Sequence, residues 1–224
     1  CRWSSTTPSR PPCCRTRSTS ALRSATKYLG GHGDVIGGVI ACSEALAIGL
    51  RQIRAVTGGL LHPLAAYLLH RGLPTLPLRM RAQQQTAQQV AYWLTGHPQV
   101  QQVYYPGFDG DLRGLLKTQL RGTGAMVAIK LTGGYRAASR VANSVRLFTH
   151  AVSLGGVDSP IQHPAALTHR PVAPDARPSN DVLRLSIGLE HVDDLIGDLD
   201  QALNGVATSG TTLNGAVEYA GFNS

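Results

Sequence analysis

A single lysine lies between two small hydroxyl residues and a glycine-rich stretch. Lys27 follows Ser24 and Thr26, and the sequence Tyr-Leu-Gly-Gly-His-Gly comes directly after it. A lysine amine can bind an aldehyde covalently, and nearby hydroxyl groups can donate hydrogen bonds to phosphate oxygens. The segment therefore predicts a site for an aldehyde cofactor that carries a phosphate group.

The alternative interpretation of Lys27 is an ordinary solvated lysine. Charged side chains are mostly exposed, and glycine clusters occur in many turns. Two further segments favour the functional interpretation. One, at 151–165, contains Val-Ser-Leu-Gly-Gly and Gln-His-Pro-Ala, and the other, at 183–190, reads Leu-Arg-Leu-Ser-Ile-Gly-Leu-Glu.

Together, and in this order, the three segments resemble the Cys/Met-metabolism (trans-sulfuration) family of pyridoxal 5′-phosphate (PLP) enzymes over about residues 24 to 203. The resemblance implies PLP as the cofactor and an amino acid as the small-molecule substrate. It implies that Lys27 forms the Schiff base with the cofactor and later moves protons between substrate carbons. It also implies that Ser24 and Thr26 bind the cofactor phosphate.

The same resemblance implies that Arg184 and Ser153 bind the substrate α-carboxylate. A guanidinium group suits bidentate recognition of a carboxylate. In a strand, the side chain of Arg184 would point away from the side of Leu183 and Leu185. The alternatives are a structural salt bridge for Arg184 and an ordinary turn position for Ser153.

Val152 bears on the substrate. Cystathionine-handling family members resemble Glu-Ser-Leu-Gly at this point, whereas methionine γ-lyases resemble Val-Ser-Leu-Gly; Gly33 and the segment 162–165 indicate the same subgroup. The resemblance thus implies a lyase acting on methionine, cystathionine or homocysteine by α,γ-elimination. The alternative for Val152 is core packing in a strand.

The implied fold is α/β: the late part of a PLP fold-type I large domain, followed by the small C-terminal α/β domain. We expect an aberrant non-family segment at 1–23, the end of the PLP-binding large domain at 24–75, the small domain at 76–204 and a loose tail at 205–224. Hydrophobic patterning predicts strands at 35–42, 100–105, 125–131, 151–154 and 182–187, and helices at 43–56, 62–70, 78–95, 135–147 and 192–203.

The first 23 residues are rich in Arg, Ser, Thr, Pro and Cys, and contain neither Asp nor Glu. The family carries an Asp in this region that pairs with the ring nitrogen of the cofactor. With suitable codons, a shifted reading frame of this segment gives Asp-Asn-Thr-Phe, which resembles that family segment. We therefore interpret the chain as a truncated fragment with a frame-shifted start. The alternative function is that of a catalytically inactive fragment that retains only a folding or oligomerisation domain.

The net charge of +8 comes mostly from the N-terminal segment. Removing its five arginines from the 21 basic residues leaves 16 against 13 acidic residues, a net charge of +3. Because the remainder shows no basic stripe interleaved with aromatic residues, we expect no nucleic-acid partner.

We expect no membrane partner and a cytoplasmic location, since the sequence contains neither a spanning apolar run nor a signal peptide. The cysteines form no paired Cys-x-x-Cys motif, and we expect no metal site. Structural roles are expected for His32, His163 and His169. The resemblance implies a homo-oligomer, specifically a homotetramer.

Overall fold

The computed structural model describes residues 21–108, 120–167 and 179–207. Most of the segment 1–23, most of the expected tail and His169 lie outside the described residues. The strands are β1 (Ala21–Ser24), β2 (Gly38–Ala41), β3 (Val100–Tyr104), β4 (Met126–Leu131), β5 (Thr149–His150), β6 (Pro160–Gln162) and β7 (Val182–Ser186). The helices are α1 (Glu44–Thr57), α2 (Pro63–Gly72), α3 (Leu76–Thr95), α5 (Gly134–Ser144), α6 (Pro164–Leu167) and α7 (Val192–Ala207), and a π-helical turn spans Ala25–Leu29.

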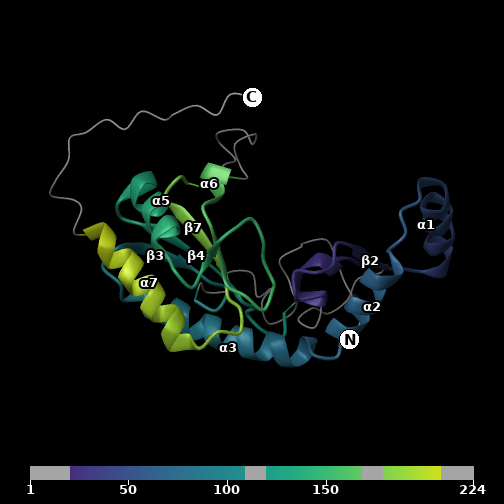
Figure 1. The fold of residues 1–224 in the computed structure, drawn as a ribbon, viewed down its shortest axis with the longest axis horizontal. Helices are drawn as coiled ribbons and strands as arrows, with labels where there is room; N and C mark the ends of the chain where they lie inside the picture. The colour runs from purple at the N-terminus through teal and green to yellow at the C-terminus, as the bar shows by residue number, and fades with distance from the viewer. Residues whose placement is uncertain (1–20, 109–119, 168–178, 208–224) are drawn as a thin grey trace.

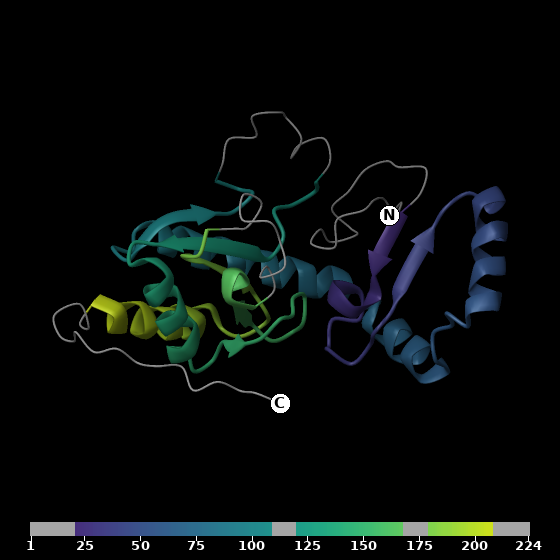
Figure 2. The same cartoon turned by 90° about the horizontal axis from the view of Figure 1, so that it is seen from above.

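The long helix α3 joins the two ends of the described fold (Figure 1). At one end, β1 pairs antiparallel with β2, and α1 and α2 lie nearby, as Figure 2 shows from above. At the other end is a five-stranded sheet in the order β3-β4-β7-β6-β5, whose only parallel pair among the described strands is β5–β6. Both α3 and α5 contact strands of this sheet, and α7 contacts both helices. The expected α/β fold class is confirmed.

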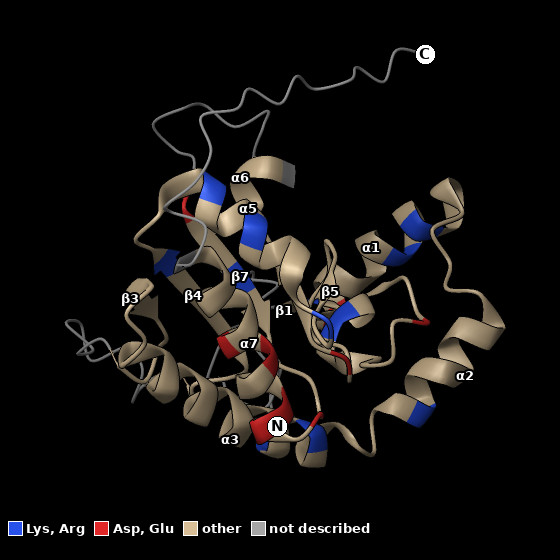
Figure 3. Ribbon diagram, turned by 60° about the vertical axis from the view of Figure 1, so that its left-hand side comes forward, with Lys and Arg blue, Asp and Glu red and all other residues tan. Residues whose placement is uncertain are grey.

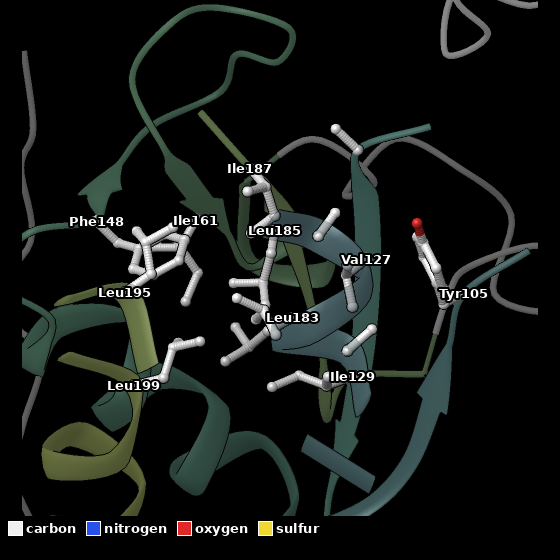
Figure 4. Packing of buried hydrophobic residues seen from close by; sticks show 14 of the residues in the cluster. Tyr105, Val127, Ile129, Phe148, Ile161, Leu183, Leu185, Ile187, Leu195 and Leu199 are labelled. Carbon is white, nitrogen blue, oxygen red and sulfur yellow. The ribbon is translucent and has the colours of Figure 1, made fainter. Parts of the chain in front are cut away.

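The hydrophobic core lies mainly between the five-stranded sheet and α7 (Figure 4). Leu183 and Leu185 of β7 and Leu195 and Leu199 of α7 are completely buried. The buried apolar residues form one cluster that continues along α3 to the turn containing Tyr28. By contrast, α1 has no buried residue. No helix among the described residues is long and apolar enough to cross a membrane.

Several predicted elements are confirmed with shifted ends. The predicted strand 35–42 is restricted to 38–41, while the predicted helix 43–56 begins after Ser43, whose hydroxyl accepts the Leu46 N–H as an N-cap. The helix predicted at 78–95 begins earlier, at Leu76, with Pro77 in its first turn, where proline is tolerated.

The prediction of a strand at 151–154 is wrong. The adjoining strand is β5, at 149–150, and the chain then leaves the sheet in a loop that turns at Gly155, where φ is +77°. The helix predicted at 135–147 ends at Ser144, because Val145 is extended and Asp198 accepts the backbone N–H groups of 146–148. The sequence analysis did not predict β1, β6 or α6.

Charged side chains are unevenly distributed over the ribbon. Acidic residues gather on α7, whereas basic residues are scattered over α1, α2, α3 and α5 (Figure 3).

Candidate active site

Lys27 lies in the π-helical turn that directly follows β1. The helical dihedral angles break at Lys27, where φ is −94° and ψ is −135°. The Gly30 N–H donates to the Ala25 carbonyl and the Gly31 N–H to the Lys27 carbonyl, both at 2.9 Å. Ala25 is buried, whereas Lys27 is only partly buried. The turn thus fixes the backbone of the lysine while its side chain remains accessible.

The two predicted phosphate ligands flank this turn. Thr26 Oγ1 accepts a hydrogen bond from the Gly37 N–H at 3.1 Å and donates a longer one to the Gly37 carbonyl at 3.4 Å. Ser24 occupies the N-cap position, but its hydroxyl makes no capping hydrogen bond. Because a hydroxyl group has a single proton, Thr26 would exchange its bond to the Gly37 carbonyl for one to a phosphate oxygen.

The loop that contains Ser153 sits against the Lys27 turn. A Cβ atom added at Gly155 would lie 2.9 Å from the backbone nitrogen of Tyr28, the residue after the lysine. The Gly155 N–H donates to the Ser186 hydroxyl at 2.9 Å, which ties the loop to the end of β7. Two of the predicted site segments are therefore in contact through Tyr28.

Arg184 lies in the middle of β7, opposite Ala128 of β4 and Gln162 of β6. As predicted, its neighbours Leu183 and Leu185 are buried on the other face, and Arg184 itself is partly buried. Burial lowers the pKa of its guanidinium group, and the phenol of Tyr28 has a smaller, opposing effect on that pKa. The charge of Arg184 thus responds to the residue that follows Lys27.

The structure brings Arg184 and Ser153 together. Arg184 Nη2 donates to the backbone carbonyl of Ser153 at 3.0 Å, whereas the Ser153 side chain is exposed. None of the ion pairs formed within the described residues involves Arg184. Within the described residues, Arg184 therefore does not form the structural salt bridge that was the alternative. Its N–H groups that do not contact Ser153 can donate to an anion.

Val152 is 57% exposed and lies in the loop beside Ser153. The core-packing alternative for Val152 is wrong, because the segment leaves the sheet before this residue. Its predicted effect on substrate choice stays a prediction.

Of the histidines singled out from the sequence, the two within the described residues, His32 and His163, have local partners. His32 Nδ1 lies 2.8 Å from the Gly30 carbonyl oxygen, and His163 Nε2 lies 2.7 Å from that of Asn180. The His163 ring also contacts the Tyr135 ring, with centroids 4.9 Å apart. Within the described part of the chain, no three His, Cys, Asp or Glu side chains are grouped as metal ligands would be.

Sequence reasoning missed the residues that hold these segments together. They are Tyr28, Gly155 and Ser186, together with Arg79 and Gln83 of α3. The glycine pair in Ser-Leu-Gly-Gly was the available signal for the tight turn at Gly155. A groove of about 500 Å³ lies elsewhere, between β2 and α1, and none of the predicted site residues lines it.

The sequence model of the family described as Cys/Met metabolism PLP-dependent enzymes matches residues 20–204. The chain belongs to this family. It is 59% identical over 184 residues to an L-methionine gamma-lyase from Brevibacterium sandarakinum, an alignment that covers 82% of this chain and 47% of the relative. It is 53% identical over 186 residues to an L-methionine gamma-lyase from Streptomyces avermitilis, covering 81% of this chain and 41% of that protein.

Solved structures of the family show the same fold. Cystathionine gamma synthase from Xanthomonas oryzae pv. oryzae superimposes with a TM-score of 0.85 at 37% identity, covering 90% of this chain and 55% of that one. A cystathionine gamma-lyase from Micromonospora echinospora gives a TM-score of 0.84 at 35% identity, covering 88% of this chain and 55% of that one. The chain thus spans about half the length of the relatives it matches.

PLP is the cofactor of this family, and the residues around Lys27 fit part of it. They offer an accessible amine and two hydroxyl groups beside it. The Ser24 hydroxyl makes no capping hydrogen bond, and the Thr26 hydroxyl donates only a long bond, of 3.4 Å, to the Gly37 carbonyl. The first acidic residue of the sequence is Asp34, so residues 1–33 supply no carboxylate for the ring nitrogen. The fit therefore covers the aldehyde and phosphate ends of the cofactor.

Proposed function

We propose that this chain carries the lysine and the carboxylate-binding arginine of a PLP-dependent carbon–sulfur lyase most similar to L-methionine γ-lyase. The substrates would be methionine, cystathionine or homocysteine, and the reaction would be an α,γ-elimination. The observation that carries this proposal is the Arg184–Ser153 hydrogen bond in a loop that rests on Tyr28, next to Lys27.

In this proposal, Ser24 and Thr26 bind the cofactor phosphate through their hydroxyl groups, and Lys27 Nζ holds the cofactor covalently. Bound PLP supplies an electron sink for the charge that develops on the substrate. With substrate bound, the free Lys27 Nζ would take the proton from the substrate Cα. A lysine suits this role because its amine is carried on a flexible four-carbon chain.

Arg184 would orient the substrate by binding its α-carboxylate with the donors that do not contact Ser153. Its partial burial strengthens this interaction, because solvent screens a half-buried charge less than an exposed one. Val152, next to Ser153 and exposed, would present an apolar surface to a thioether side chain. A valine there offers no partner for the second charged group of cystathionine, which favours methionine.

The second candidate function is a fragment that folds but does not turn over substrate. This candidate is favoured because residues 1–33 contain no Asp or Glu. A carboxylate beside the ring nitrogen of PLP keeps that nitrogen protonated, which makes the cofactor a stronger electron sink.

We also propose that the chain forms homo-oligomers. Support comes from the large apolar side chains left exposed on α1 and α2, which include Ile53, Val56, Leu64 and Tyr67. Sedimentation velocity over a range of concentrations tests this point, and a single monomeric species throughout would contradict it.

The test of the function is release of the products of α,γ-elimination and hydrolysis, a 2-oxo acid, ammonia and a thiol, from methionine in the presence of PLP. We expect release by the unaltered chain and none by Lys27→Ala. Arg184→Ala should raise KM more than it lowers kcat, because it removes a contact present in both ground state and transition state. A chain that binds PLP at Lys27 but releases no product would favour the second candidate.

A further inference from the structure

Three polar side chains follow one another at a spacing of four residues: Thr75, the N-cap residue of α3, and Arg79 and Gln83 within the helix. Residues four apart on a helix lie above one another, about 6 Å apart along the axis. Arg79 is 4% exposed and Gln83 is fully buried, although both sit in a helix that otherwise buries apolar residues. Burial of an arginine and a glutamine is costly unless their hydrogen bonds are made elsewhere.

Arg79 donates hydrogen bonds to three oxygen atoms, one of which belongs to Tyr28, the residue after Lys27. Nη1 donates to the Tyr28 carbonyl at 3.0 Å, Nη2 to the Gly72 carbonyl at 2.9 Å and Nε to Thr75 Oγ1 at 3.0 Å. No acidic side chain of the described residues forms an ion pair with it. Burial lowers the pKa of Arg79, but an arginine remains charged, so these oxygens must solvate its cation.

The fit around Arg79 is close. A Cβ atom at Gly31 would collide with its guanidinium group, and one at Gly72 would collide with the Gly30 carbonyl. The planar fork therefore fills the space between α2, the start of α3 and the Lys27 turn. A lysine ammonium group could not donate to all three of these acceptor oxygens, because it lacks the planar fork of three nitrogen atoms.

Gln83, one turn further along α3, contacts the other two site segments. Its Nε2 donates to the Gly156 carbonyl at 2.6 Å and to the Ile187 carbonyl at 3.1 Å. Gly156 belongs to the loop of Ser153, and Ile187 directly follows the strand of Arg184. Three segments that are remote in the sequence are thus held by two neighbouring turns of one helix.

We propose that Arg79 and Gln83 are positioning residues that set the Lys27 turn at a fixed place relative to Ser153 and Arg184. The inference rests on the proposed function for its catalytic meaning, but the positioning itself is a property of this chain without cofactor. Arg79 acts on Lys27 through the Tyr28 carbonyl, and Gln83 acts on Arg184 and Ser153 through the Ile187 and Gly156 carbonyls.

The experiment is amide hydrogen exchange on the whole chain without cofactor, for Arg79→Met, Arg79→Lys and Gln83→Met. Arg79→Met should speed exchange of the hydrogen-bonded Gly30 and Gly31 amides about 10-fold or more, since the loss of a buried charge-assisted bond releases the turn. Arg79→Lys should have a smaller effect at the same amides. Gln83→Met should speed exchange of the Gly155 amide and leave that of Gly30 unchanged.

Two exposed residues of α3 provide matched controls, Arg81→Met and Gln85→Met. Both should leave these amides unchanged. Equal exchange in Arg79→Met and Arg81→Met would overturn the proposal, as would a uniform increase in exchange over the entire chain in both Arg79 variants. If Arg79→Met does not fold, Arg79→Lys decides. A change in exchange confined to Gly30 and Gly31 in Arg79→Lys supports the proposal, and unchanged exchange at these two amides overturns it.

A second readout separates this proposal from the function. Borohydride trapping of PLP should label Lys27 more slowly in Arg79→Met than in Arg81→Met. If the unaltered chain takes no label while the exchange pattern is as expected, the proposed function fails and the positioning stands. If labelling proceeds at equal rates in all variants, the positioning has no effect on the cofactor and the inference fails.

Discussion

At the residue scale, Tyr28 connects the parts of the candidate site. Its backbone nitrogen lies under Gly155, its carbonyl accepts from Arg79, and its phenol affects the pKa of Arg184. The residue is buried and directly follows Lys27. Changes in the loop or in α3 should therefore reach the lysine through this one neighbour.

Gly155→Ala tests the contact between the loop and Tyr28. At φ +77° an alanine is strained, and its Cβ would press on the Tyr28 backbone. We expect a loss of about 2 kcal/mol or more in the free energy of unfolding, measured by urea titration. Gly134→Ala is the control, because Gly134 also has a positive φ but open space around the added Cβ. This variant should lose only the part of the unfolding free energy that comes from backbone strain. Equal losses in the two variants would contradict the contact.

Ser153 and Arg184 should respond differently to conservative substitutions. Because Ser153 meets Arg184 through its backbone carbonyl, Ser153→Ala should leave that hydrogen bond in place. Arg184→Lys loses the planar fork. In a PLP-loaded protein, we expect the KM for methionine to rise about 10-fold or more for Arg184→Lys and markedly less for Ser153→Ala. Steady-state kinetics measures both, and a larger effect of Ser153→Ala would show that its hydroxyl binds the carboxylate instead.

At the element scale, Asp198 of α7 fixes the chain between α5 and β5. It is buried, and its carboxylate accepts the N–H groups of Arg146, Leu147 and Phe148 at 2.7 to 2.9 Å. We expect Asp198→Ala to reduce the free energy of unfolding by roughly 2–4 kcal/mol, because three backbone donors lose a charged acceptor. Asp194→Ala, exposed on the same helix, should cost at most about 1 kcal/mol. Chemical denaturation distinguishes these values, and similar losses would refute the role of Asp198.

The strand β3 leads into Tyr105, whose hydroxyl group is buried. It lies 2.6 Å from Thr123 Oγ1 and donates to the Gly124 carbonyl at 3.0 Å, and burial raises the pKa of Tyr105 above its ordinary value of 10.0. The folded chain thus holds this proton more tightly than the unfolded chain. Its contribution to stability is complete below pH 10 and is lost as the pH rises through the folded-state pKa.

Comparison of the unaltered chain with Tyr105→Phe isolates this effect. We expect the free energy of unfolding to fall more steeply above pH 10 for the unaltered chain than for Tyr105→Phe. Urea unfolding at several pH values between 8 and 11 measures the two slopes. Parallel slopes would show that Tyr105 ionises equally in both states.

Local patterns predicted most elements but not how the site is held. The predicted helix 192–203 and the strand of Arg184 follow from apolar spacing, and their inward residues are buried. The strand predicted at 151–154 is wrong because its apolar residues, such as Val152, are typical of a buried strand. In the structure, Gly155 instead packs against Tyr28 and donates to Ser186, and the segment forms a loop outside the sheet. Such contacts join residues that are far apart in the sequence, and the local spacing of apolar residues carries no information about them.

The strand β1 was missed for a related reason. Its burial alternates, but the buried positions carry Ala21 and Arg23 and the exposed one carries Leu22, the reverse of the usual apolar pattern. Arg79 was likewise unpredictable, since its partner Tyr28 lies 51 residues away. The motifs indicated which residues belong to the site, while their relative placement required the fold.

At the scale of the whole molecule, α3 connects the Lys27 end to the five-stranded sheet (Figure 1). A two-stranded sheet is at best marginally stable alone, and α1 adds no buried residue to it. The Lys27 turn is therefore held by α2, α3 and the Ser153 loop, all of which follow it in the sequence. The placement of Lys27 relative to Arg184 therefore depends on all of these contacts, in a chain that spans about half the length of its relatives.

The decisive measurement is the visible absorbance of the purified chain with added PLP, followed by borohydride reduction and peptide mapping. We predict an absorbance band that Lys27→Ala abolishes, and reduction should fix the cofactor on the peptide that contains Lys27. No Lys27-dependent band, or label on the other lysines that Lys27→Ala retains, would contradict a cofactor site at this turn.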